Sequence, residues 1–85
     1  MNRKKLLKRL SQGAVTNAGF SDLINLASGF GFRESRVSGS HHIFTHPKTV
    51  ELLNLQEVGG QGKPYQIRQL LKLVERYNLK LEGDE

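Results

Sequence analysis

The feature that most constrains the fold is a change in the spacing of apolar residues along the chain. Towards both ends, apolar side chains recur every three or four residues, which is typical of amphipathic helices. Between residues 32 and 56 the pattern gives way to short runs separated by turn residues, which favours strands. A chain of 85 residues is too short to divide its apolar surface between two cores. We therefore expect one α+β domain, with helices on one side of a small antiparallel sheet.

Three segments have the helical spacing. Residues 3–12 combine a narrow apolar stripe with basic residues. A second helix is expected to begin at Ser21, whose hydroxyl can cap the first turn, and to end at Gly31. The third covers residues 64–78, and its proline suits a first helical turn. The predicted buried faces are Leu6, Leu7 and Leu10; Leu23, Ile24, Leu26, Ala27 and Phe30; and Ile67, Leu70, Leu71, Val74 and Tyr77.

The middle of the chain predicts strands separated by turns. Ser38-Gly39-Ser40 is a strong turn signal, and Pro47 is expected to end the strand before it. Residues 14–19 have no periodicity and are interpreted as a connector, and the Gly-rich segment 59–62 as a flexible loop. The expected strands are residues 32–37, 41–46 and 50–56.

The composition excludes several classes of protein. There is no cysteine, which excludes disulfides, thiolate metal sites and a cysteine nucleophile. No apolar run approaches the roughly 20 residues that cross a bilayer. The basic N-terminus is followed only by Leu6 and Leu7 before charge returns, so it has no signal-peptide core. We therefore expect a cytoplasmic protein that does not engage a membrane.

The charge of the chain favours a polyanionic partner. There are 13 Lys and Arg residues against 8 Asp and Glu residues, a formal net charge of +5. Such an excess of positive charge on a small protein favours binding to nucleic acid, to an anionic membrane surface or to an acidic protein. Of these partners we favour nucleic acid. Five basic residues fall in the first nine positions, where they form either a phosphate-binding arm or the solvated face of a helix: Arg3, Lys4, Lys5, Lys8 and Arg9.

Three histidines, His41, His42 and His46, lie within six residues. On a strand that rises about 3.3 Å per residue, His42 and His46 stand roughly 13 Å apart, too far to share one ion. His41 and His42 point to opposite faces of such a strand. We therefore expect no metal site and no cofactor.

Acid–base catalysis is the second hypothesis for these histidines. Histidine has an ordinary pKa of about 6.5, so it can both accept and donate protons at neutral pH. RNA cleavage needs no metal, because the ribose 2′-hydroxyl is an internal nucleophile. Phe44 is expected to face the helices with His42 and His46, which leaves His41 on the open face of the sheet beside Gly39. On these residues alone, incidental surface histidines are the better interpretation.

A resemblance to a known family changes that balance. Residues 39–47, Gly-Ser-His-His-Ile-Phe-Thr-His-Pro, resemble the signature of HicA toxins, in which Gly-Ser-His precedes an aromatic residue by three positions and often a His-Pro. Residues 63–71 resemble the start of the family's final helix in one of its subgroups. The similarity covers about residues 20–79. It implies a fold like a double-stranded RNA-binding domain over residues 20–82, a three-stranded antiparallel sheet with two helices on one face, preceded by a basic helical extension at 1–19.

The resemblance also implies an activity and a partner. HicA toxins cleave mRNA independently of the ribosome and are neutralised by a HicB antitoxin. The family's catalytic histidine directly follows Gly-Ser, and here that residue is His41. We thus expect a metal-independent endoribonuclease with Gly39 and Ser40 at the substrate. The resemblance assigns no second catalytic group; apart from it, we suggest Lys48 and Lys63 as stabilisers of phosphate charge.

Two alternatives stay open at this point. One is a noncatalytic RNA-binding module of the same fold, and the other is a protein-interaction domain whose basic surface meets an acidic partner. Sequence preference on RNA is expected to be modest, because the chain has few aromatic residues beyond Tyr65, Tyr77 and four phenylalanines, several of which the core needs.

Overall fold

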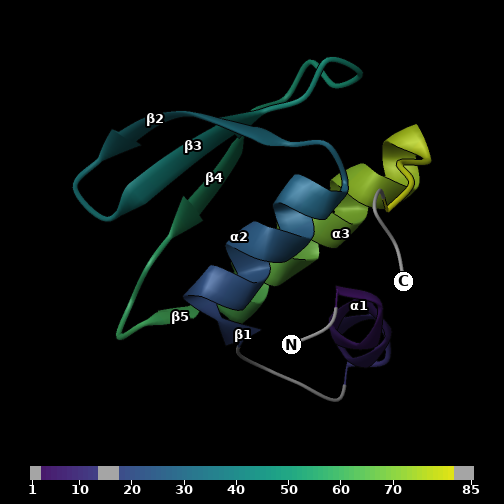
Figure 1. The fold of residues 1–85 in the computed structure, drawn as a ribbon, viewed down its shortest axis with the longest axis horizontal. Helices are drawn as coiled ribbons and strands as arrows, with labels where there is room; N and C mark the ends of the chain where they lie inside the picture. The colour runs from purple at the N-terminus through teal and green to yellow at the C-terminus, as the bar shows by residue number, and fades with distance from the viewer. Residues whose placement is uncertain (1–2, 14–17, 82–85) are drawn as a thin grey trace.

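The computed structural model describes residues 3–13 and 18–81. The chain is arranged in three layers: a three-stranded sheet, two helices across one face of that sheet, and a third helix on the far side of those two (Figure 1). The central order helix, three antiparallel strands, helix is that of a fold like the double-stranded RNA-binding domain, as the sequence predicts. The elements are α1 (Arg3–Ser11), β1 (Ala18–Gly19), α2 (Phe20–Gly29), β2 (Arg33–Ser38), β3 (His41–Thr45), β4 (Leu53–Gln56), β5 (Gln61–Gly62) and α3 (Pro64–Tyr77).

One core joins the three layers. Apolar side chains from α1, α2 and α3 meet those of β3 and β4 in a single cluster. Within the described residues no helix is both long and apolar enough to cross a membrane. The buried residues of the core are Leu6, Leu10, Ala18, Phe20, Leu23, Leu26, Ala27, Phe30, Phe32, Phe44, Leu53, Leu55, Ile67, Leu70, Leu73 and Leu79.

The helices lie close to their predicted positions, with one correction at the start of α2. The helix begins at Phe20, after Gly19 at its N-cap, and no side chain caps it. The prediction that Ser21 caps it is therefore wrong. The Phe20 N–H donates a 2.9 Å hydrogen bond to the Gly60 carbonyl, so a distant loop satisfies one of the free donors of the first turn. At the other end of the chain α3 ends at Asn78, which takes the left-handed conformation that closes a helix.

A second, two-stranded sheet was not predicted. β1 pairs antiparallel with β5, so Ala18 and Gly19 are not simply a connector, and the Gly-rich loop contains a strand. Residues 14–17 of the expected connector lie outside the described residues. The backbone of Gly62 lies against the fully buried Leu23: a Cβ on Gly62 would stand 2.5 Å from Leu23 Cδ2. A side chain at this position would require buried Leu23 to shift. The lack of a side chain on Gly62 also removes the alternation by which a strand is recognised.

The N-terminal helix packs on the rest of the domain. Leu6 and Leu10 of α1 are buried in the common core. The Arg3 guanidinium binds α2 through hydrogen bonds to the carbonyl oxygen and the side-chain oxygen of Asn25. The basic helix α1 is thus a layer of the fold, and its exposed face carries basic side chains.

The register of the main sheet separates a core face from an open face. The sheet order is β2-β3-β4, and all pairs are antiparallel. Phe44 lies opposite Leu53, and both are buried beneath the helices. His41 lies opposite Gln56 on the other face, as the alternation predicts. This face is the one that the helices leave uncovered (Figure 1).

The predicted strand boundaries need two further corrections. The strand expected at 41–46 ends at Thr45, and the strand expected at 50–56 begins only at Leu53. Between them a turn is closed by a hydrogen bond from the Thr49 N–H to the His46 carbonyl. Val50 lies in this connection with 90% of its surface exposed, so its apolar character does not reflect burial.

Candidate active site around His41

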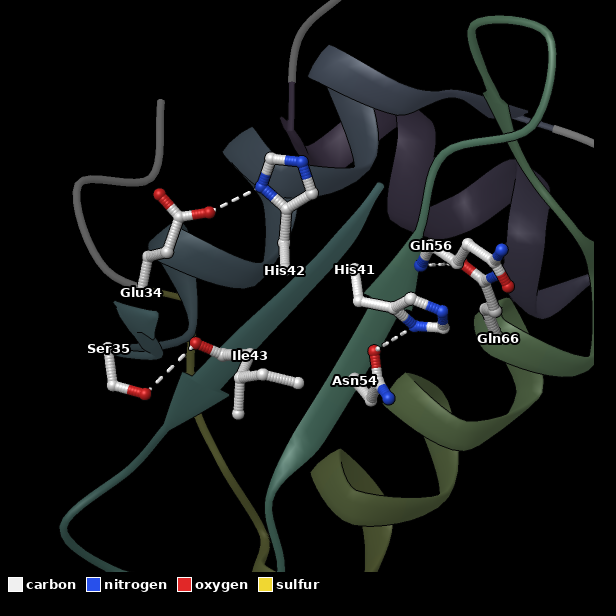
Figure 2. Close-up of polar contacts among 8 residues, drawn as sticks. All are labelled: Glu34, Ser35, His41, His42, Ile43, Asn54, Gln56 and Gln66. Atoms are coloured by element: carbon white, nitrogen blue, oxygen red, sulfur yellow. Dashed lines mark hydrogen bonds and ion pairs between the residues drawn. The ribbon is translucent and has the colours of Figure 1, made fainter. Parts of the chain in front are cut away.

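His41 is the first residue of β3, and its imidazole is held by a side chain of the neighbouring strand. The ring Nδ1 lies 3.3 Å from Oδ1 of Asn54 on β4 (Figure 2). An amide oxygen only accepts, so this bond requires a proton on Nδ1. In the neutral ring the other nitrogen, Nε2, is then unprotonated and able to accept a proton. The Asn54 contact therefore favours the tautomer whose Nε2 can accept a proton.

The side chain of His41 lines a pocket of about 250 Å³ between the sheet and α3. β4 is an edge strand of the main sheet, and α3 runs beside it. The lining residues bring amides and a hydroxyl to the imidazole, and none of them carries a fixed charge. Such a pocket suits an uncharged polar group beside the imidazole. Its lining residues are His41, Asn54, Gln56, Tyr65 and Gln69.

A buried glutamine fixes the wall of this pocket. Gln66 of α3 is fully buried, and its Oε1 accepts a 3.0 Å hydrogen bond from the backbone N–H of Gln56. Its Nε2 donates to the Tyr65 hydroxyl at 3.3 Å. Sequence reasoning missed this residue because it is polar. The sequence did contain a sign of its burial: Gln66 lies four residues before Leu70, on the buried stripe of α3.

The turn before His41 is tied to the end of β4. Gly39 has a φ of +61°, a conformation that glycine adopts without strain. The Ser40 carbonyl accepts a 3.1 Å hydrogen bond from the Glu57 N–H. The Ser40 hydroxyl accepts a longer one, 3.4 Å, from the side chain of Gln56. The predicted substrate-contacting residues Gly39 and Ser40 thus form an exposed, braced turn that leads directly into His41.

The other two histidines have structural partners. His42 points towards the helix side, where its Nδ1 lies 2.5 Å from Oε2 of Glu34 (Figure 2) and its ring lies 4.9 Å from that of Phe20. His46 lies beyond β3, where its Nε2 donates to the Phe30 carbonyl at 2.9 Å. Its Nδ1 accepts from the Lys48 N–H at 3.0 Å, so both nitrogens of His46 bind backbone. The described residues include no group of three or more His, Asp or Glu side chains placed to hold a metal ion.

The two predicted phosphate-binding lysines lie outside the His41 pocket. Lys48 follows the far end of β3, roughly 13 Å or more along the strand direction from its start. There it lines a second pocket of about 400 Å³ with two further cations, Arg33 and Lys80, and no acidic side chain. Lys63 is the N-cap of α3, two residues before Tyr65. The structure therefore places a basic pocket at one end of the sheet and His41 at the other.

A carboxylate joins the β3–β4 connection to the end of α3. Glu51 accepts hydrogen bonds of 2.6 Å from the Tyr77 hydroxyl and 2.6 Å from the Arg76 guanidinium. The hydrogen bond from Tyr77, with a smaller contribution from Arg76, holds the pKa of Glu51 below its ordinary value. The same bond raises the pKa of Tyr77. This cluster stabilises the fold at a distance from the His41 pocket.

Comparison with models of protein families finds a match over residues 20–76 with the family described as HicA toxin of bacterial toxin-antitoxin. The matched segment begins with α2, ends within α3, and contains the sheet, the turn and every lining residue of the His41 pocket. The helix α1 precedes it. Neither the curated proteins nor the solved structures gave a match.

Proposed function

The chain belongs to the HicA toxin family of bacterial toxin–antitoxin systems, and on this premise we propose that it is a metal-independent endoribonuclease that cleaves mRNA and thereby blocks translation. As a member of the family it is the toxin of a pair and has an antitoxin partner. The observation that carries the enzymatic proposal is the hydrogen bond between His41 and Asn54. It leaves a basic ring nitrogen free at the pocket beside the edge strand β4, between the sheet and α3.

In the proposed reaction the ribose 2′-hydroxyl attacks the adjacent phosphorus. Nε2 of His41 takes the hydroxyl proton as the new bond from the 2′-oxygen to phosphorus forms. The bond from phosphorus to the 5′-oxygen breaks, and that oxygen takes a proton from water or from the imidazolium. The products are a 2′,3′-cyclic phosphate and a free 5′-hydroxyl. The Asn54 carbonyl holds the ring in place and accepts from Nδ1–H throughout.

Positive charge near the site is proposed to bind the RNA backbone. The exposed turn at Gly39 and Ser40 offers main chain close to His41. Lys63 lies near the pocket in sequence, at the N-cap of the helix that supplies Tyr65. Lys48 acts further away, where Arg33 and Lys80 join it to bind a phosphate of the same strand.

A HicB-type antitoxin is the proposed protein partner. The formal charge of +5 suits a partner that presents acidic side chains. The open face of the sheet carries both His41 and the turn before it, so a partner that covers this face excludes RNA from the site.

The test is cleavage of a long single-stranded RNA by the purified protein in excess chelator. We expect His41→Gln to lower the rate by about 10²- to 10⁴-fold, the usual contribution of one acid–base group. The matched control is His42→Gln, which changes the adjacent histidine on the opposite face and is expected to keep cleaving. Circular dichroism checks that both variants are folded. If the wild type binds the RNA but does not cut it, the protein is a noncatalytic RNA-binding module; if it does neither, it is a protein-interaction domain.

A further inference from the structure

The aromatic residues of the chain divide sharply by exposure. All four phenylalanines are buried in the core, and the sequence has no tryptophan. Tyr77 is half-buried against the core, with its hydroxyl bound to Glu51. Tyr65 is 56% exposed. All six phenylalanine and tyrosine residues lie in the described part of the chain, so Tyr65 is the one such ring that is free to stack with a ligand, and it lines the pocket of His41.

The ring of Tyr65 is held in place although it is exposed. Its hydroxyl accepts a hydrogen bond from the fully buried Gln66, which in turn binds the backbone of Gln56 on the edge strand. This chain of bonds anchors the tip of the tyrosine to the pocket wall and leaves the ring accessible. A ring fixed in this way loses little conformational freedom when a flat ligand stacks on it.

The rest of the pocket presents hydrogen-bonding groups without fixed charge. The amide of Gln69 is half-buried and binds no other side chain or backbone group of the described residues. Gln56 uses its Nε2 on Ser40 and leaves its Oε1 without a partner in that same part of the structure. Amides of this kind match the donors and acceptors on the edge of a nucleobase. Cations, which favour phosphate, line the pocket at the other end of the sheet instead.

We propose that the pocket beside His41 binds one unpaired nucleobase of the RNA, stacked on Tyr65 and hydrogen-bonded to the amides of Gln56 and Gln69. This inference rests on the proposed function and names the part of the substrate that the site recognises. Stacking on an aromatic side chain together with hydrogen bonds to a base edge is the common means of reading single-stranded RNA. The identity of the bound base then selects the position at which the strand is cut.

The experiment compares Tyr65→Ala with Tyr65→Phe on a defined RNA, by rate and by mapping of the cut ends. Loss of one stacked base lowers kcat/KM by about 5- to 150-fold, and the cut sites lose their preference. Tyr65→Phe keeps the ring, so its cut sites are expected to match those of the wild type. Leu52→Ala is the matched control, because Leu52 is 55% exposed and outside the pocket. Gln69→Ala is expected to change the preferred base and to lower the cleavage rate at the sites that the wild type prefers.

A second readout does not require catalysis. The non-cleavable probe is a 2′-O-methyl tetranucleotide that contains 2-aminopurine, whose fluorescence falls when it stacks. We expect quenching by the wild type and by Tyr65→Phe, and a 5- to 150-fold weaker affinity for Tyr65→Ala. If Tyr65→Ala binds the probe and cuts the same sites as the wild type, the base pocket is wrong while the ribonuclease stands. If the wild type does not cut but quenches in a Tyr65-dependent manner, the ribonuclease is wrong while the pocket stands.

Discussion

Replacement of Gln66 by methionine tests the bonds that hold the wall of the His41 pocket. Methionine has an unbranched side chain of similar size, so the change removes the amide without opening a large cavity. Two hydrogen bonds are lost. One comes from the Gln56 N–H at 3.0 Å, and the other goes to the Tyr65 hydroxyl at 3.3 Å.

The two bonds contribute unequally to the free energy of unfolding. The Tyr65 residue is exposed, so water replaces its lost partner at little cost. The Gln56 N–H is part-buried, and a buried donor without a partner costs about 1–3 kcal/mol. Because the burial of Gln56 is only partial, we expect a loss of about 1–2 kcal/mol. For a domain of this size each kcal/mol lowers Tm by about 4–8 °C.

The assay is urea unfolding together with hydrogen exchange at the backbone amide of Gln56. The matched control is Gln69→Met, the same change one turn later at an amide without partners, which is expected to shift stability by less than about 0.5 kcal/mol. The Gln56 amide is expected to exchange faster in Gln66→Met and unchanged in the control. Equal stability of the two variants, with unchanged protection of Gln56, would refute the reasoning.

Three further predictions concern the fold and the RNA. Tyr77→Phe removes a hydrogen-bond donor from Glu51 and raises the pKa of Glu51 towards the ordinary 4.5. A carboxyl whose pKa is lowered on folding stabilises the protein above pH 4.5, and this stabilisation is lost as the pH falls through the pKa of the folded state. The free energies of urea unfolding at about pH 7 and about pH 3 are therefore expected to differ less in the variant than in the wild type. Gly62→Ala places a Cβ against buried Leu23 and is expected to cost about 1–3 kcal/mol in the same assay. Lys48→Ala is expected to weaken RNA binding and to lower the salt slope by about 0.7, with unchanged cut sites; an unchanged slope would remove Lys48 from the phosphate contacts.

The helices were predictable from the sequence because their burial follows a regular spacing. Leu23 and Leu70, for example, are fully buried at positions that the periodicity marks. The β1–β5 pair was not predictable, because two-residue strands of Ala, Gly and Gln carry neither alternation nor β-branched side chains. Their pairing depends on the approach of Gly62 to Leu23, which is a tertiary contact.

The candidate site was predictable in part. The alternation along β3 placed His41 on the open face, and the family resemblance singled it out. Its neighbours could not be found in the same way, because Tyr65 and Gln69 approach it only through the packing of α3 beside β4. The position of Lys48 was not predictable, because only the turn after β3 places it with Arg33 and Lys80 at the end of the strand away from His41.

The three histidines show why position in a motif does not by itself assign a role. The hydrogen-bond partners of the ring nitrogens distinguish the three histidines. His46 has both ring nitrogens hydrogen-bonded to backbone, so its ring serves the fold. His42 binds the carboxylate of Glu34 on the helix side of the sheet, opposite to the face that carries His41. His41 alone among them lines the amide pocket, and its bond to Asn54 leaves Nε2 able to accept a proton. The unprotonated Nε2 at the amide pocket is the geometric feature on which the proposal of His41 as the catalytic base rests.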